Sequence, residues 1–142
     1  MENNVKYANL TKGETIAYLE FGNISSPPLI MTYGNFSTKE SNLPFVPKLK
    51  ESYRLILIDL RGYGDSSYKK VPLSIEDLAD DINFFLTQLK IEKTSLIGLS
   101  LGCTAVLNFA AKYPGKTDKV VVISPVPFTE CLYFTKIKVK TL

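Results

Sequence analysis

The chain has 142 residues, 45% of them hydrophobic and 22% charged, which suits one soluble globular domain and is too short for two ordinary ones. Its formal charge is +3, and without Lys136, Lys138 and Lys140 in the last seven residues the net charge would be zero. A neutral remainder excludes an extended basic face for nucleic acid, and aliphatic runs of at most four residues exclude a membrane-spanning helix.

The first part of the chain predicts a hairpin followed by a buried strand. Apolar residues spaced mostly by two over residues 16–21 follow a turn at Gly13, as in an exposed β-hairpin. Residues 29–32 then form a short apolar strand. Two prolines within residues 37–52 predict that any helix there is short or broken.

The centre of the chain alternates strands with helices. Residues 55–58 are all aliphatic, which is typical of a parallel strand covered on both faces. Residues 75–89 place apolar side chains on one helical face, and Ser74 with Asp77 forms a capping pair. Three elements follow: a strand through Leu96 and Ile97, a helix over 101–113 that stops before Pro114, and a strand over 119–124. This order predicts an α/β fold with a mostly parallel sheet and helices on both faces.

The pentapeptide Gly98-Leu99-Ser100-Leu101-Gly102 has the G-x-S-x-G form of a nucleophile elbow, with a predicted strand before it and a predicted helix after it. Turning from strand to helix in one residue strains the serine and lifts its Oγ out of the sheet. The alternative is a small-residue turn that only lets a helix pack closely on a strand. Because the flanking elements fit, we interpret Ser100 as a nucleophile.

Two backbone N–H groups complete the predicted site. In serine acyl transfer, one donor to the oxyanion is the residue after the nucleophile, here Leu101. The other comes from the loop after an earlier strand, where Asn35 follows Gly34. An ordinary turn is the alternative for Asn35, and only the motif around Ser100 favours the oxyanion role.

Cofactor sites are not expected. Cys103 and Cys131 form neither a disulfide framework nor a zinc pattern, the sequence contains no histidine, and we interpret Cys103 as helix packing. Gly62-Tyr63-Gly64 is similar to a dinucleotide loop, but Ser67 replaces the third glycine. The first ten residues have no secretory signal pattern, so a cytoplasmic location is expected.

Taken together, these motifs resemble the N-terminal part of an α/β-hydrolase of the single-domain esterase, lactonase and haloperoxidase type. The resemblance covers about residues 5–127 and rests on four segments: "TYGNFS", "DLRGYGDSS", "SIEDLADDINFFLTQLKIEK" and "LIGLSLG" with "AAKYPGKTDKVVVISP" after it. It implies Ser100 as nucleophile, with the N–H groups of Leu101 and Asn35 as oxyanion donors. Tyr33 and Leu99 depart from the family pattern, in which histidine or a polar residue is usual.

The resemblance also implies that about as many residues again are missing after the sixth strand. In the family they carry a lid, two more strands, the acid of the catalytic triad and its histidine. Asp65, Asp118 and Glu130 are candidate acids, for each of which a solvated surface charge is the favoured interpretation, and no motif places a lysine near Ser100 as a base. The expected division is a partial hydrolase domain over 1–127 and an unplaced tail over 128–142.

Three functions stay open. The chain is the truncated, inactive part of a serine hydrolase for small acyl substrates, or a non-catalytic binding or scaffold protein with the same fold, or one half of a split enzyme. We favour the first, because Gly98, Ser100 and Gly102 are intact. No nucleic acid or membrane partner is expected, and the open edge of the last strand favours self-association or pairing with another chain.

Overall fold

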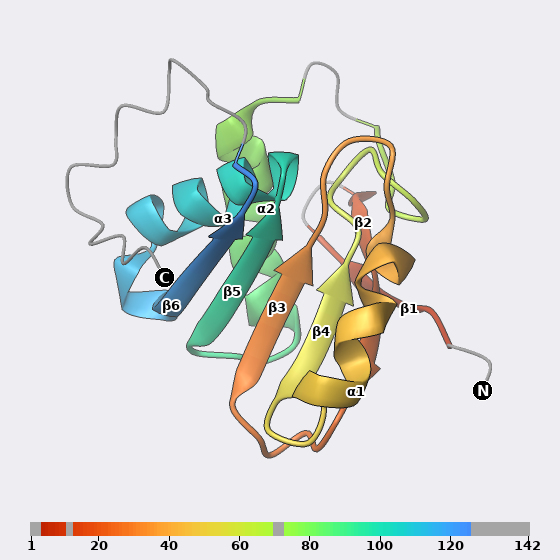
Figure 1. Cartoon of the computed structure of the whole chain (residues 1–142). Coiled ribbons are helices and arrows are strands. Elements are labelled where there is room, and N and C mark those ends of the chain that lie inside the picture. The colour runs from red at the N-terminus through yellow and green to blue at the C-terminus, as the bar shows by residue number, and fades with distance from the viewer. Residues whose placement is uncertain (1–3, 11–12, 70–72, 126–142) are drawn as a thin grey trace.

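The computed structural model describes residues 4–10, 13–69 and 73–125 (Figure 1). Its sheet has six strands in the order β1-β2-β4-β3-β5-β6. The strands are β1 Lys6–Asn9, β2 Thr15–Phe21, β3 Pro28–Thr32, β4 Arg54–Ile58, β5 Thr94–Leu99 and β6 Thr117–Ile123. The helices are the 3₁₀ segments η2 Lys39–Phe45 and η3 Pro114–Lys116 and the α-helices α1 Val46–Leu49, α2 Ile75–Gln88 and α3 Leu101–Lys112. The predicted α/β fold is therefore confirmed.

Strand pairing brings the C-terminal ends of β3, β4 and β5 to the same end of the sheet. β1, β2 and β4 pair antiparallel, whereas β4, β3, β5 and β6 pair parallel. The register aligns Thr32 at the end of β3 with Ile58 of β4 and Gly98 of β5. The chain segments that follow β3, β4 and β5 consequently start side by side, and Ser100 is in one of them.

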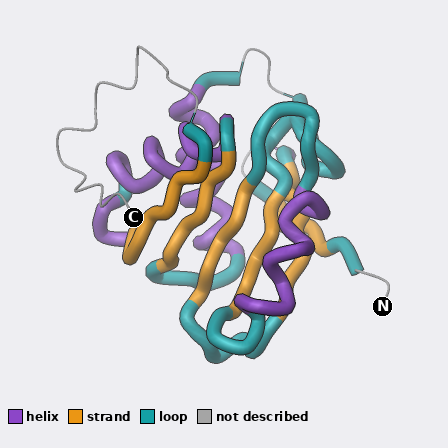
Figure 2. Tube along the Cα trace, viewed as in Figure 1, coloured by secondary structure: helices purple, strands orange, loops and turns teal. Residues whose placement is uncertain are grey.

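Helices cover both faces of the sheet unequally. On one face α2 and α3 lie against the strands (Figures 1 and 2). Their Phe85 and Phe109 are buried among residues such as Ile56 and Leu96. On the other face the cover is short: Val46 of α1 joins a second cluster with β2, β3 and β4. The prolines explain the short cover, since Pro44 lies inside η2 and α1 has a proline in its first turn.

The two long helices begin where their sequences predict. Ser74 caps α2, and its side chain and that of Asp77 exchange hydrogen bonds with each other's backbone N–H in a capping box. α3 begins directly after Ser100 and ends before Pro114. At the turn predicted around Gly13, this glycine has φ +77°, a conformation that glycine adopts without strain.

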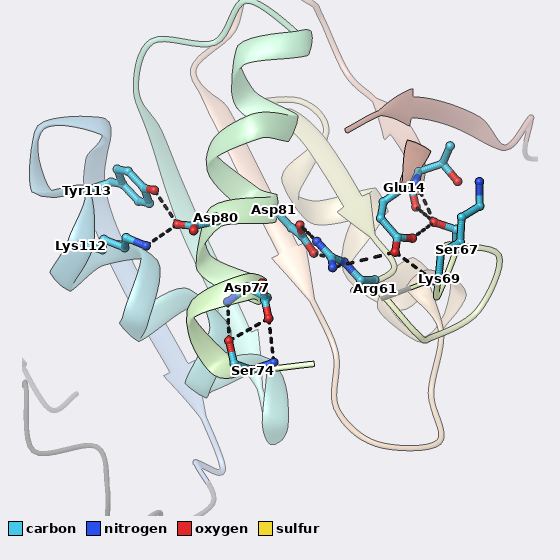
Figure 3. A network of polar contacts seen from close by, with 11 residues as sticks. Glu14, Arg61, Ser67, Lys69, Ser74, Asp77, Asp80, Asp81, Lys112 and Tyr113 are labelled. Atoms are coloured by element: carbon cyan, nitrogen blue, oxygen red, sulfur yellow. Dashed lines mark hydrogen bonds and ion pairs between the residues drawn. The ribbon is translucent and has the colours of Figure 1, made fainter. Parts of the chain in front are cut away.

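Figure 3 shows a buried polar network centred on Arg61 that the sequence patterns did not predict. Arg61 Nε donates to Asp81 Oδ2 on α2 at 2.8 Å, and its guanidinium lies 3.9 Å from Glu14 Oε1. Glu14 also accepts hydrogen bonds from the Ser67 hydroxyl and, at 2.9 Å, from the Lys69 backbone N–H. The network ties α2 and the start of β2 to the segment after β4.

The last described strand, β6, lies at one edge of the sheet. Glu130, Cys131 and the predicted tail over 128–142 lie outside the described residues. No helix within the described ranges is long and apolar enough to cross a membrane.

Candidate active site

Ser100 has the backbone conformation of a sharp strand-to-helix turn. Its φ of 51° and ψ of −120° lie in a region that non-glycine residues rarely adopt. Its N–H donates to the carbonyl oxygen of Ile123 on β6 at 3.0 Å, and its own carbonyl accepts from the Cys103 N–H at 3.0 Å. The strained residue is therefore held by hydrogen bonds from both the neighbouring strand and the first turn of α3.

Two glycines of the motif allow this turn because other backbone atoms lie where a side chain would be. A Cβ on Gly98 would be 2.5 Å from the carbonyl oxygen of Gly102. A Cβ on Gly102 would be 2.9 Å from the carbonyl oxygen of Tyr33, at the end of β3. The glycines let α3 approach both β5 and β3.

Residues 34–38, which we call the 34–38 loop, begin against Ser100. A Cβ placed on Gly34 would lie 2.6 Å from Ser100 Cβ, 2.9 Å from Ser100 Oγ and 3.0 Å from the backbone N of Leu101. The structure thus brings the loop after β3 to the serine and to the Leu101 N–H. Asn35, the next residue, accepts a hydrogen bond on Oδ1 from the Tyr63 hydroxyl at 2.6 Å; its oxyanion role stays a prediction.

A fully buried lysine lies at the far end of this loop. Lys39 Nζ donates to Asp59 Oδ2 at 2.9 Å, to Asp65 Oδ2 at 2.6 Å, and lies 3.0 Å from Glu40 Oε1. Burial disfavours its charge, but the hydrogen bonds to Asp65, Asp59 and Glu40 outweigh burial and raise the pKa of Lys39 above its usual value. The raised pKa and the three carboxylate contacts favour the charged form of Lys39, which is unsuited to the role of a base.

Sequence reasoning missed this cluster. Asp59 comes directly after the aliphatic run 55–58 of β4, at the end of the sheet where Ser100 lies, and that position was the available signal. No local pattern pairs Asp59 with Lys39, 20 residues earlier. Their contact depends on the path of the 34–38 loop over the end of the sheet.

The structure places two of the three candidate acids, Asp118 and Asp65, in other contacts. Asp118 lies at the start of β6 and accepts a hydrogen bond from Ser95 Oγ at 3.3 Å, so it is at the opposite end of the sheet. Asp65 is bound to Lys39, and Glu130 is outside the described residues. The ion pair with Lys39 occupies Asp65, and Asp118 is remote from Ser100, so a role for any of the three as triad acid stays a prediction.

Cys103 packs as the sequence suggested. It is buried in α3, and its Sγ lies 3.1 Å from the Gly98 carbonyl oxygen and 3.3 Å from that of Ile123. Burial raises the pKa of the Cys103 thiol, which makes it a poor nucleophile at neutral pH. Within residues 4–10, 13–69 and 73–125, no group of His, Cys, Asp and Glu residues is arranged to hold a metal ion.

Comparison with known proteins identifies relatives of this arrangement. The model of the family described as alpha/beta hydrolase fold matches residues 27–140. A probable alcohol acetyltransferase of Wickerhamomyces anomalus is 26% identical over 94% of this chain and 40% of its own length. Lipase 3 of a Moraxella species is 30% identical over 87% of this chain and 40% of its own length.

The fold also matches solved structures of longer proteins. A hydrolase from Pseudomonas aeruginosa superposes with a TM-score of 0.81 at 24% identity, over 86% of this chain and 46% of that one. The chain thus spans about 40% of the length of the curated relatives it matches, and the match covers their N-terminal portion.

Proposed function

This chain belongs to the α/β-hydrolase fold family, and we propose that it carries the nucleophile half of a serine hydrolase site for carboxylic esters or related acyl substrates. The observation that supports the proposal is the φ of 51° at Ser100, between β5 and α3, with Gly34 against its Oγ. The names of the relatives, among them a lipase and an acetyltransferase, agree with acyl chemistry.

The proposed chemistry assigns three groups. Ser100 Oγ attacks the acyl carbon, and the carbonyl oxygen becomes a tetrahedral oxyanion as the carbonyl π bond opens. The N–H groups of Leu101 and Asn35 donate to that oxyanion. Leu101 is the first residue of α3, where unpaired N–H groups and the helix dipole favour negative charge.

The same mechanism requires a base to take the hydroxyl proton and return it to the leaving group. The 142 residues contain no histidine. Lys39, which directly follows the 34–38 loop, is held by carboxylates and so does not supply the base. Without a base, the oxyanion donors alone give rates lower by orders of magnitude. We therefore expect the isolated chain to be inactive.

Two alternatives use the same fold differently. A non-catalytic binding or scaffold protein requires that the 142-residue chain be stable by itself. One half of a split enzyme requires a second polypeptide that supplies the acid and the histidine. The intact elbow geometry favours a hydrolase, because a scaffold has no need of a strained serine.

The decisive measurement is the intact mass, in an extract of the source cells, of the polypeptide that contains the peptide around Ser100. A mass about twice 15.9 kDa identifies a longer hydrolase, whose ester hydrolysis Ser100→Ala must then abolish. A mass of 15.9 kDa leaves the scaffold or the split enzyme. Retention of hydrolysis by Ser100→Ala in the longer form overturns the proposed nucleophile.

For the isolated chain the prediction is no ester turnover that depends on Ser100. The test compares p-nitrophenyl ester hydrolysis by the purified wild-type chain and by Ser100→Ala at pH 7 to 8. Equal rates at the level of the buffer are expected. A robust rate in the wild type that the substitution removes shows that a group other than histidine serves as base.

A further inference from the structure

Two side chains of the 34–38 loop form hydrogen bonds to the adjoining η2, Ser37 to Ser41 and Thr38 to Glu40, but the loop has little support at Phe36. Phe36 has φ +57°, a strained conformation for a bulky residue, and its side chain is fully exposed at 104% relative accessibility. An exposed side chain contributes no packing that would hold the strained backbone. Neither of the two hydrogen bonds to η2 involves Asn35, so the position of Asn35 depends on contacts from other segments.

The first contact fixes Asn35 itself. The Tyr63 hydroxyl donates to Asn35 Oδ1 at 2.6 Å from a segment 28 residues further along the chain. Tyr63 is partly buried against the core beside α2, and burial raises the pKa of its phenol, so the hydroxyl stays a donor at neutral pH. A rigid aromatic ring thus holds the residue whose N–H is the proposed oxyanion donor.

The second contact fixes the other end of the loop. The Asp59 carboxylate accepts the backbone N–H of Lys39 at 2.6 Å and the Lys39 ammonium at 2.9 Å, and it also accepts the N–H of Asp65 at 2.9 Å. A Cβ on Gly64 would lie 2.2 Å from Asp59 Oδ2, so the turn closes tightly around this carboxylate. Asp59 therefore joins the start of η2 to the segment after β4.

That segment, residues 59–67, is itself fixed to the sheet. Ser66 Oγ donates to the carbonyl oxygen of Asp59 at 2.8 Å and accepts the N–H of Ala17 on β2 at 2.9 Å. The N–H of Ser67 donates to the carbonyl oxygen of Thr15 at 3.0 Å. Both contacts on the 34–38 loop thus start from a segment anchored to a buried strand.

We propose that the 59–67 segment clamps the 34–38 loop at both ends, with Tyr63 as a positioning residue for Asn35 and Asp59 as a positioning residue for Lys39. The clamp restricts Asn35, the residue after Gly34, which itself lies against Ser100, and an oxyanion donor needs such a fixed position before substrate arrives. The proposal rests on the proposed function for its purpose, but the clamp is a physical coupling that can be measured without any hydrolysis.

The test is hydrogen–deuterium exchange of the whole 142-residue chain, read on peptides that cover the 34–38 loop and, as a folding control, β5. Tyr63→Phe removes only the hydroxyl, and we expect the loop amides to exchange about two- to tenfold faster while β5 is unchanged. Tyr7→Phe, at an exposed tyrosine on β1, is the matched control and is expected to leave the loop unchanged.

A double-mutant cycle separates the clamp from a general loss of structure. In an Asn35→Ala background Tyr63→Phe is expected to have no further effect, because the acceptor is gone. In an Asn35→Asp background the effect is expected to return, since a carboxylate also accepts from the phenol. Asp65→Asn, which weakens the Lys39 end, is expected to speed loop exchange, with the exposed Asp118→Asn as its control.

Loop exchange that Tyr63→Phe leaves within the range of the Tyr7→Phe control overturns the clamp. An equal effect of Tyr63→Phe in the wild-type and Asn35→Ala backgrounds also overturns it. Neither result bears on Ser100 as nucleophile, which depends on hydrolysis in the longer form. Conversely, if a longer form keeps its activity without Ser100, the proposed function is contradicted. The proposed clamp between the 59–67 segment and the 34–38 loop is unaffected by that result.

Discussion

Ser100 lies at a backbone conformation that costs free energy for any residue with a side chain. Residues held in such regions cost on the order of 1 to 3 kcal/mol, and glycine adopts positive φ without that cost. We predict that Ser100→Gly raises the free energy of unfolding by about 1 kcal/mol. Urea unfolding followed by circular dichroism measures the change.

Ser52 provides the matched control for this prediction, because it is an exposed serine without positive φ in the turn before β4. Ser52→Gly is expected to lower the free energy of unfolding by about 0.5 to 1 kcal/mol through the added freedom of the unfolded chain. Loss of stability in Ser100→Gly equal to that in Ser52→Gly contradicts the strain argument.

Gly34 is constrained by the atoms around it and not by its dihedral angles. A methyl group there meets Ser100 Cβ at 2.6 Å and the backbone N of Leu101 at 3.0 Å. We predict that Gly34→Ala lowers the free energy of unfolding by about 1 to 3 kcal/mol, because the loop must move away from α3. In a longer, active form the same variant is expected to lose hydrolysis as well.

Gly115 is the control for this substitution, because a Cβ there meets nothing within 4 Å. Gly115→Ala is expected to change the free energy of unfolding by less than about 0.5 kcal/mol. Thermal or urea unfolding of the two variants side by side checks both values. A Gly34→Ala variant as stable as Gly115→Ala means that the 34–38 loop is not held against Ser100.

At the scale of elements, Glu20 links three antiparallel strands through their side chains. It accepts from Lys6 of β1 at 2.8 Å and from Arg54 of β4 at 2.6 Å. Burial alone raises the pKa of Glu20, but the hydrogen bonds and charges of Lys6 and Arg54 outweigh it and hold the pKa below its usual value.

This lowered pKa predicts a pH dependence of stability. A carboxyl group whose pKa is lower in the folded than in the unfolded state stabilises the fold above the unfolded value, about 4.3, and the effect is lost as pH falls through the folded value. Glu20→Gln is therefore expected to cost about 1 kcal/mol at pH 7 and less below pH ~4. The exposed Glu51→Gln is the control in urea unfolding at both pH values; a cost at Glu20 that does not shrink with acid contradicts the prediction.

The elements were predictable from the sequence because each has a local cause. Alternation marks the hairpin, the aliphatic run marks β4, and the capping box with an apolar face marks α2. The strand order was less accessible, since β4 lies between β2 and β3 and no local pattern determines which strands become neighbours. The buried charges were missed for the same reason: Asp81 lies on the apolar face of α2 because Arg61 reaches it from another segment.

At the scale of the whole molecule, the candidate site is a partial one. The sequence predicted the sharp strand-to-helix turn at Ser100 because the G-x-S-x-G spacing is local, and the approach of Gly34 to Ser100 follows from parallel strands that end together. The clamp from the 59–67 segment depends on three chain segments meeting, so spacing alone did not predict it. In the proposed site the described residues contribute Ser100 and the loop held beside it, and the proposed mechanism needs a further group to move the proton.

Among the described strands β6 lies at the edge of the sheet, away from η2 and α1 (Figure 1). Two apolar side chains of β6, Val121 and Ile123, are 41% and 37% exposed. Exposed apolar side chains on an unpaired edge favour pairing with a second copy of the same strand. We predict that the isolated chain self-associates as its concentration rises and that Val121→Glu shifts it toward monomer, because a carboxylate on this strand opposes burial.

Sedimentation velocity over a range of concentrations measures both effects. The control is Ile24→Glu, at an isoleucine that is 69% exposed between β2 and β3, and it should leave association unchanged. A wild-type chain that stays monomeric, or a Val121→Glu variant that associates as the wild type does, shows that β6 is not the contact.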